Sequence, residues 1–218
     1  MEGGGALATE ELLKLGNIGD ANQLVDIIPI GTASLLGIEL LLGFNKSIGT
    51  GGVSLNGFFD AFGLEATLLT GTWIIILFQM TRWLYTSFYS STGRGWSPVM
   101  FVVALIAVQV VHDLIMYYGS LQNTPTKKNE IIDALKVYAQ ENGRTALLNH
   151  SLLLLVVAVL AMVYSEKSLF TNVFTMVVAL YFLPYLLTQA GPKAPPPPPP
   201  KASPKVNVQP QWGMPMGY

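Results

Sequence analysis

The stretch PVMFVVALIAVQVVHDLIMYY (residues 98–118) decides how this chain is built. A helix needs about 20 mostly apolar residues to cross roughly 30 Å of hydrocarbon, and this stretch is long enough. Pro98 suits the first helical turn, because the N–H that proline lacks has no helical partner there. The run also contains two ionisable residues, His112 and Asp113. It predicts a transmembrane helix that carries an imidazole and a carboxylate.

Apolar runs of similar length occur three more times, at residues 64–84, 147–164 and 169–188. Arg82 lies near one end of the first of these runs, where a long side chain can reach polar headgroups. Pro184 lies late in the last run and predicts a kink or a frayed final turn. The pattern predicts an all-α polytopic membrane protein with about four transmembrane helices within residues 64–188.

The composition favours lipid as the main solvent. Of 218 residues, 51% are hydrophobic and only 11% are charged, whereas soluble domains carry about 25% charge. The net charge of −1 lacks the basic bias of nucleic-acid binders, so no nucleic-acid partner is expected. The absence of cysteine excludes disulfides, cysteine-ligated metals and thiol nucleophiles. The acidic start has no basic segment before a short apolar core, so no cleaved signal peptide is expected.

Residues 1–63 form an acidic, glycine-rich region that is harder to interpret. Its apolar part, LVDIIPIGTASLLGIELLLGF (24–44), contains Asp26 and Glu39. A carboxylate at the centre of a spanning helix costs about 2.5–3.5 kcal/mol on insertion scales. We therefore predict an interfacial or re-entrant helix, with a full span as the alternative. The following GTGGVSLNG (49–57) is predicted to be a loop, and it lacks the Lys-Ser/Thr pair of a phosphate-binding loop.

An amphipathic helix is predicted at residues 127–141, between the second and third of the four spans. Ile131, Leu135 and Tyr138 recur at helical spacing and form one apolar face. Pro125 precedes this helix, and Asn142-Gly143 supplies a stop signal. We expect the helix to lie flat on the membrane or on the bundle. A docking surface for a neighbouring protein is the alternative.

Residues 189–218 form a proline-rich tail. Six consecutive prolines favour polyproline II, a strut of roughly 20 Å at about 3.1 Å per residue. An extended C-terminal arm that binds a partner is predicted, with a disordered tail as the alternative. The residues expected to contact the partner are Pro195, Pro196, Pro197, Pro198, Pro199, Pro200, Trp212 and Tyr218.

The polar residues of the second and third spans are predicted to meet. Gln109, His112 and Asp113 share one helix face by the i, i+3, i+4 rule. Asn149 and His150 lie in the first turn of the third span, which enters from the same side. We predict an interhelical polar cluster with an Asp113–His150 or a His112–Asn149 contact. Such contacts contribute roughly 0.6–2 kcal/mol.

This cluster favours a structural tie over chemistry. A proton or ion pathway is the next alternative, because intramembrane ionisable residues often mark one. Two histidines and one aspartate on separate helices have no established metal-ligand spacing. No nucleophile elbow is visible either. We therefore expect no enzyme activity, no metal, no cofactor and no small-molecule substrate.

The basic residues predict an orientation. With four spans, the N-terminal region, the 119–146 connection and the tail share one face, which carries every basic residue except Arg82, Arg94 and Lys167. The positive-inside rule then places both termini in the cytoplasm. An interfacial aromatic belt is predicted after the first span, at Trp83, Tyr85, Phe88, Tyr89 and Trp96.

VQVVHDLIMYYG (108–119), followed by NEIIDALKVYAQENGRTALLNHSLLLL (129–155), resembles a family of membrane proteins of the large nucleocytoplasmic DNA viruses. In that family, a span ending in His-Asp is followed by a short loop, an amphipathic helix and a polar-then-apolar span. The match runs from about residue 98 to 160. The proline-rich tail also looks like those of algal, chlorovirus-like proteins. The resemblance implies a virion membrane or minor capsid protein.

The expected function is therefore structural: linking or organising an internal lipid membrane beneath an icosahedral capsid. The expected location is the virion internal membrane, and host intracellular membranes during assembly. The expected partners are the bilayer and capsid or other virion proteins, contacted through the tail and the amphipathic helix. Two alternatives stay open. One is a small transporter or channel subunit that uses His112, Asp113 and His150. The other is an adaptor whose polyproline tail recruits partners.

Overall fold

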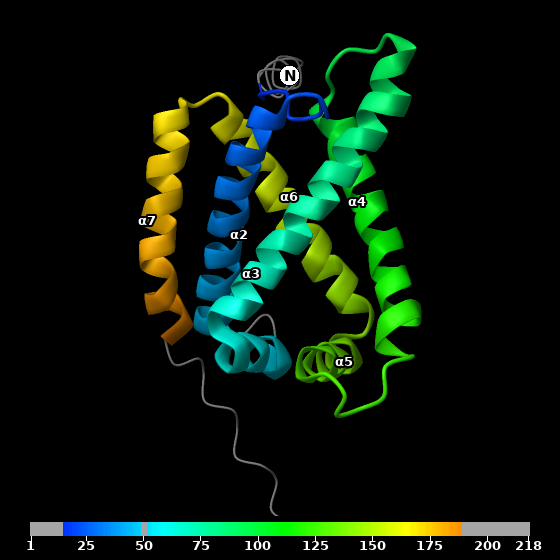
Figure 1. Cartoon of the computed structure of the whole chain (residues 1–218), viewed down its shortest axis with the longest axis vertical. Coiled ribbons are helices and arrows are strands. Elements are labelled where there is room, and N and C mark those ends of the chain that lie inside the picture. The colour runs from blue at the N-terminus through cyan, green and yellow to red at the C-terminus, as the bar shows by residue number, and fades with distance from the viewer. Residues whose placement is uncertain (1–14, 49–51, 189–218) are drawn as a thin grey trace, which may run out of the picture.

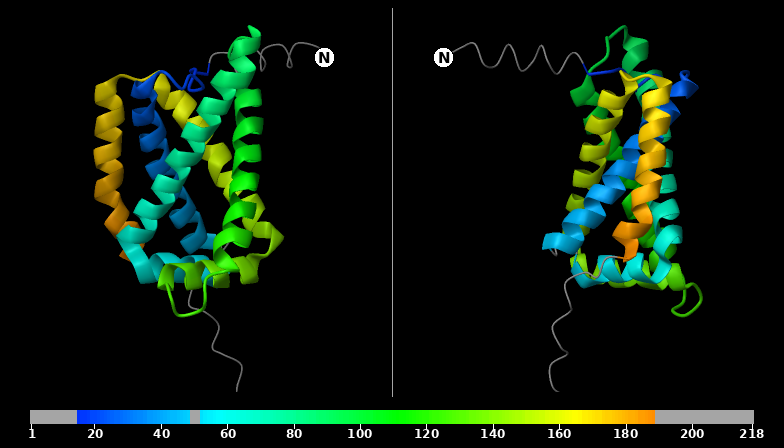
Figure 2. Two further views of the ribbon diagram at one scale, coloured as in Figure 1. Left: turned by 45° about the vertical axis from the view of Figure 1, so that its right-hand side comes forward. Right: turned by 90° about the vertical axis from the view of Figure 1, so that its left-hand side faces the viewer.

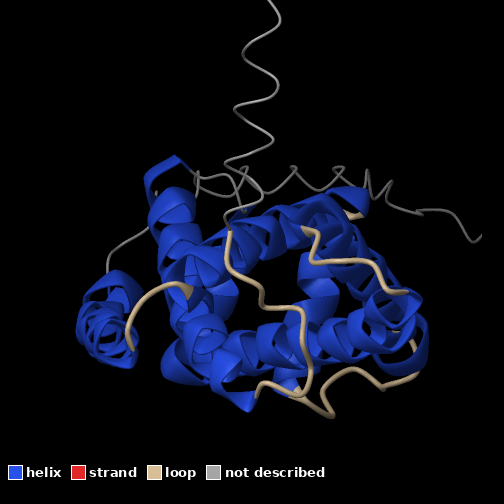
Figure 3. Cartoon of the chain, turned by 90° about the horizontal axis from the view of Figure 1, so that it is seen from above, coloured by secondary structure: helices blue, strands red, loops and turns tan. Residues whose placement is uncertain are grey.

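The computed structural model describes residues 15–48 and 52–188. Within these ranges all regular structure is helical, and Figure 3 shows only helices and connecting loops among the described residues. A single 3-10 turn, Leu24–Asp26, leads into the first long helix. The α-helices are α2 (Ile27–Ile48), α3 (Gly52–Leu84), α4 (Pro98–Ile115), α5 (Glu130–Asn142), α6 (Arg144–Ser165) and α7 (Leu169–Thr188) (Figure 1).

Five of these elements are long and apolar enough to cross a membrane. With their helical extensions they run over Leu24–Phe44, Gly57–Thr92, Pro98–Leu121, Arg144–Ser165 and Leu169–Thr188. The predicted all-α class is confirmed, but the candidate spans number five and not four. The added one is α2, which packs against α3, α6 and α7 and is the most buried of the five.

Residues 24–44 are predicted to form an interfacial or re-entrant helix, with a full span as the alternative. In the structure they form a 3-10 turn, Leu24–Asp26, followed directly by α2, and α2 runs the length of the bundle (Figure 1). They make one of the five candidate spans. Pro29 is tolerated because it lies in the first turn, where its missing N–H leaves no bond unmade. The hydroxyls of Thr32 and Ser34 bond back to the carbonyls of Ile28 and Ile30, at 3.0 and 2.7 Å. These polar side chains are therefore satisfied within the helix.

The predicted loop at 49–57 is wrong for residues 52–57, which begin α3; residues 49–51 lie outside the described chain. α3 bends sharply at Gly63, where φ is 48° and only glycine fits without strain. Residues 52–62 lie across one end of the bundle beside α5, and the rest of α3 rises diagonally (Figure 2). We call residues 52–62 and α5 together the platform.

α5 lies flat, as predicted, but begins at Glu130 and not at residue 127. The side chain of Asn129 caps it by accepting from the backbone N–H of Ile132 at 3.1 Å. The preceding Lys127 has a positive φ of 69°, which no helix accommodates. The stop at Asn142-Gly143 is where the sequence places it, with φ 51° at Gly143.

The described chain begins and finishes at opposite ends of the bundle (Figure 1). The upper end holds residues 15–26 and the connections α3–α4 and α6–α7. The lower end holds the platform and Thr188. The four-span interpretation puts the N-terminal region and the tail on the same side of the membrane. In the structure, residues 15–26 and Thr188 lie at opposite ends of the bundle (Figure 1).

Candidate functional site

The predicted polar residues of α4 and α6 come together in the lower half of the bundle. Oδ2 of Asp113 lies 2.8 Å from Nδ1 of His150 across the two helices. Oδ1 of Asp113 lies 3.2 Å from Nδ1 of His112, its neighbour in sequence. Asp113–His150 is one of the two interhelical contacts that the helix geometry predicts. The single carboxylate therefore lies between two imidazoles.

Gln109 joins the same cluster from one turn earlier on α4. Its Nε2 donates to Oδ2 of Asp113 at 2.7 Å, and its Oε1 accepts from the Ser151 hydroxyl at 2.8 Å. Gln109 is fully buried, and a buried amide left unpaired would be costly. The pair with Ser151 gives α4 and α6 a second polar tie next to the first.

Trp73 of α3 belongs to this cluster and was not predicted. Its indole Nε1 donates to Nδ1 of His112 at 3.2 Å. Its ring centroid lies 5.2 Å from that of His150 and 6.2 Å from that of His112. One sequence signal could have found it. Tryptophan prefers the ends of a span, whereas Trp73 lies near the middle of the run 64–84.

α5 closes the cluster from below through Tyr138, which stacks on the His150 ring with centroids 5.9 Å apart. Ile131 and Leu135 pack against the core from the same helix. Asn149 hydrogen-bonds the Tyr138 side chain and is not paired with His112. Burial raises the pKa of Tyr138 above its ordinary value, so the phenol stays protonated at neutral pH.

A second polar cluster lies near the upper end, around Arg82. The prediction that Arg82 reaches the headgroups is wrong, because its side chain is completely buried. Its Nη2 contacts Oδ2 of Asp26 at 3.0 Å, the Gln23 carbonyl at 2.6 Å and the Asp20 carbonyl. Its Nη1 donates to Oε1 of Gln79 at 2.9 Å. The guanidinium therefore holds residues 20–26 against α3.

The segment before α2 is fastened over this end by further bonds. Thr86 donates to the Gly19 carbonyl and accepts from the Ala21 N–H, at 2.9 and 3.0 Å. Trp96 donates its indole N–H to the Leu15 carbonyl at 3.0 Å, and Ile18 is fully buried. The whole stretch 15–26 therefore acts as a strap across the upper end.

A cavity of about 310 Å³ lies beside this strap, with Asp20 on its wall. The pKa of Asp20 lies below its ordinary value, chiefly because the carboxylate accepts a hydrogen bond from the backbone N–H of Asn22. Asp20 is therefore negatively charged at neutral pH. Apart from this carboxylate, the cavity is lined by uncharged side chains and glycine: Asn17, Gly19, Asn22, Tyr85, Thr86, Ser90 and Trp96.

The predicted aromatic belt holds only in part. Trp83 and Phe88 are exposed, as a belt requires. Tyr85 is only 4% exposed, and its ring packs against those of Trp96 and Phe101 with centroids 5.5 and 5.7 Å away. Tyr85 therefore belongs to the core, because the strap and the start of α4 cover it.

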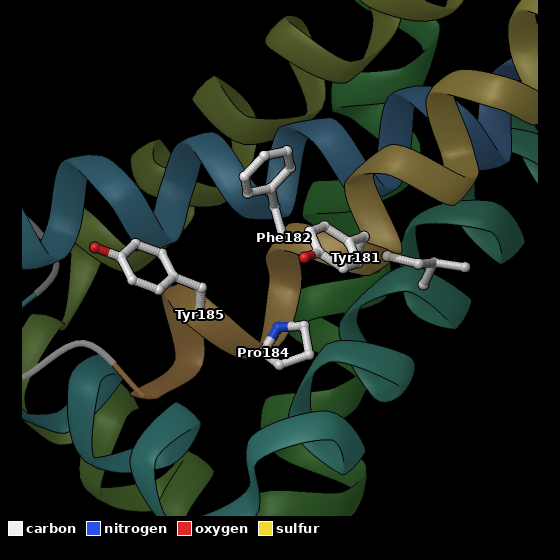
Figure 4. A pocket seen from close by; sticks show the side chains of 5 residues that line it. Tyr181, Phe182, Pro184 and Tyr185 are labelled. Carbon is white, nitrogen blue, oxygen red and sulfur yellow. The ribbon is translucent and has the colours of Figure 1, made fainter.

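α7 is the least buried of the five candidate spans and carries a shallow groove of about 660 Å³ near its lower end. Tyr181, Phe182 and Tyr185 spread around Pro184, with Leu180 completing the wall (Figure 4). The three aromatic side chains are all more than half exposed, which matches a surface facing lipid tails. The helix continues through Pro184 to Thr188, whose hydroxyl bonds the Pro184 and Tyr185 carbonyls at 3.0 and 3.1 Å.

Among residues 15–48 and 52–188, no three His, Asp or Glu side chains are grouped so as to hold a metal ion. The tail residues singled out above, 195–200 with Trp212 and Tyr218, lie outside the described chain. No protein-family profile, curated protein or solved structure matches this chain. The fold and the two clusters define a helical bundle whose five apolar helices indicate association with a membrane.

Proposed function

We propose that this chain is a structural membrane protein that organises an internal virion membrane and links it to the surrounding capsid. The main observation behind the proposal is that the polar side chains inside the candidate spans bond one part of the chain to another. Asp113 and Gln109 tie α4 to α6, and Arg82 ties the strap to α3. Both clusters form contacts within the protein and stabilise the helical bundle, as expected of a protein with a structural role in a membrane.

The exposed basic residues at the two ends of the bundle support an orientation of the protein in the membrane. The lower end exposes Lys127, Lys128 and Arg144 around the platform. The upper end exposes Arg94 and Lys167, while Arg82 is buried in an ion pair. By the positive-inside rule the lower end faces the cytoplasm during assembly. Thr188, the last described residue, lies at the same end as the platform (Figure 1), and capsid proteins would contact the platform there.

The resemblance of residues 98–160 to membrane proteins of large DNA viruses supplies the virion part of the proposal. That stretch contains α4, α5 and most of α6, and therefore the whole Gln109–Asp113–His150 tie and Tyr138 beneath it. The contacts of this region support a structural role, in which its polar side chains hold α4 and α6 together.

Cross-linking mass spectrometry on purified particles tests this proposal. We expect the tail lysines Lys193, Lys201 and Lys205 to form links to capsid proteins. Lys167 at the upper end is the matched control and should form none. Absence of the chain from particles would overturn the proposal, and so would capsid links confined to Lys167.

A small transporter or channel subunit is the second candidate, and one observation favours it. Glu39 in the middle of α2 has a buried oxygen, Oε1, without a hydrogen-bond partner, and lone intramembrane carboxylates often mark ion paths. Purified protein in liposomes loaded with a pH-sensitive dye separates the two candidates. We expect no proton flux above that of protein-free vesicles. Flux that disappears in His112→Ala would replace the structural role by transport.

A further inference from the structure

The polar cluster in the lower half of the bundle consists of Gln109, His112, Asp113, His150 and Trp73, and we call it the lower cluster. One of its atoms, Nδ1 of His112, has two hydrogen-bond partners that it cannot satisfy at the same time. Nδ1 of His112 lies 3.2 Å from the indole Nε1 of Trp73 and 3.2 Å from Oδ1 of Asp113. An indole N–H can only donate a hydrogen bond, and an ionised carboxylate can only accept one. Without a proton, Nδ1 accepts from Trp73. With a proton, Nδ1 donates to Asp113 and the indole N–H has no acceptor.

The other donors to Asp113 have no such conflict. Nδ1 of His150 faces Oδ2 of Asp113 alone, so it carries a proton and donates. The Gln109 amide also donates to Oδ2. A carboxylate accepts about four hydrogen bonds on its two oxygens. Oδ1 therefore has room for a third donor. The bond from the Trp73 indole assigns the neutral His112 ring to the tautomer with its proton on Nε2, so His112 becomes that third donor when Nδ1 takes up a further proton.

We infer that His112 is a proton-binding site that exchanges one hydrogen bond for another. In the neutral ring, Nδ1 accepts from Trp73 and ties α3 to α4. When a proton from solvent binds Nδ1, the ring donates to Asp113 within α4 and the tie to α3 is lost. The only covalent change is formation of one N–H bond. This inference goes beyond the structural role, because it makes the packing of α3 on α4 depend on pH.

Two ionisable groups lie beside His112. Asp113 on α4 is the carboxylate in contact with Nδ1, and His150 on α6 bonds the other oxygen of that carboxylate. α5 contributes Tyr138, which stacks on His150 and has Glu141 of the same helix as a charged neighbour. Within the described part of the chain, the α3 side chain that bonds His112 is the uncharged Trp73. The side chains of His112 and His150 are 26% and 32% exposed, so the helices do not fully enclose either ring.

The exchange of hydrogen bonds at His112 also affects the contacts of α5, one of the two parts of the platform, because His150 lies between Trp73 and α5. Trp73 packs on His150, and His150 stacks on Tyr138 of α5. A Trp73 ring released from His112 therefore also changes its contact with the ring that α5 rests on. Histidine is the side chain that ordinarily titrates between about pH 5 and 8. A membrane compartment of mildly acidic pH would thus act on the α3–α4–α5 contacts.

Nuclear magnetic resonance of the full chain in micelles, with ¹⁵N-labelled histidine and tryptophan, tests the inference. The chain has two histidines and four tryptophans, so every signal can be assigned. Lowering the pH from about 8 to about 5 should add a proton to Nδ1 of His112. The Trp73 indole proton should move upfield with the same midpoint. The Trp96 indole, which donates to the backbone carbonyl of Leu15, is an internal control and should not move.

Two results would overturn the inference. One is a Trp73 indole signal that stays fixed while His112 takes up its proton. The other is a His112 ring that keeps one protonation state over the whole range. In His112→Asn the Trp73 signal should become independent of pH, and the titration of the unmodified chain decides the matter if that variant does not fold. The liposome assay is independent, since this exchange requires no flux and its failure would leave the structural role intact.

Discussion

Replacing Asp26 with alanine is expected to lower the free energy of unfolding by about 3 kcal/mol, because it leaves a buried charge without its counter-charge. Arg82 has no solvent exposure, and among residues 15–48 and 52–188 Asp26 is the carboxylate in contact with its guanidinium. The carbonyls of Gln23 and Asp20 would remain as partners, but they carry only partial charge. Unfolding of the purified protein in mixed micelles, followed by far-ultraviolet circular dichroism, measures the change.

Asp20→Ala is the matched control, since it makes the same chemical change in the same strap. Arg82 uses only the backbone carbonyl of Asp20, which the substitution keeps. We expect Asp20→Ala to cost about 1 kcal/mol or less, the worth of its side-chain bonds to Asn22 and Gln23. The double variant Asp26→Ala with Arg82→Met should recover part of the loss, because both charges are then gone. Equal unfolding of Asp26→Ala and Asp20→Ala would refute the assignment of Arg82 to a buried ion pair.

Gly37→Ala is expected to lower the free energy of unfolding by about 1–3 kcal/mol, the usual cost of overfilling a packed core. A Cβ at residue 37 would lie 2.5 Å from Cγ2 of Val157 on α6. Val157 is fully buried, and a helical valine has one strongly preferred rotamer, so the methyl group cannot turn aside. α2 and α6 would have to move apart along their main contact. The same unfolding assay measures the loss.

Gly31→Ala provides the control within the same helix, because a Cβ there meets nothing within 4 Å. Alanine should leave stability unchanged at Gly31 or raise it by up to about 1 kcal/mol through helix propensity. Adding Val157→Ala to Gly37→Ala removes the clashing methyl, so the two changes together should cost less than the sum of each alone. If Gly37→Ala behaves like Gly31→Ala, then α2 is not packed closely on α6.

The helical elements and one of their contacts could be predicted from sequence because the signals are local. α4 and α7 start where the apolar runs at 98 and 169 start, since run length against bilayer thickness sets the element. The Asp113–His150 contact follows from helical periodicity and from two spans that meet at one side of the membrane. The Asn129 cap, which starts α5 at Glu130, is also a local signal, whereas the prediction starts this helix at residue 127.

The errors arise where a residue's environment depends on distant parts of the chain. Asp26 looks costly in a spanning helix when it is considered alone, and this cost, with that of Glu39, favours an interfacial or re-entrant helix at residues 24–44 over a full span. Its partner Arg82 is 56 residues away and supplies the compensating charge. The place of Trp73 in the lower cluster could not be predicted for the same reason, because no residue near it in sequence indicates that α3 packs on α4 beside His112.

The sequence by itself determined that this chain is helical, apolar enough for a membrane, and furnished with a carboxylate and two imidazoles at matching depth. Hydrophobic run length and helical periodicity are properties of neighbouring residues, so no fold was needed to find them. The tertiary structure decided that α2 joins the bundle and that Arg82 is buried. It also decided that His112 faces both an indole donor and a carboxylate acceptor. Those outcomes depend on which helices touch, and the free energy of a buried charge or donor is set by partners that only packing brings within hydrogen-bond distance.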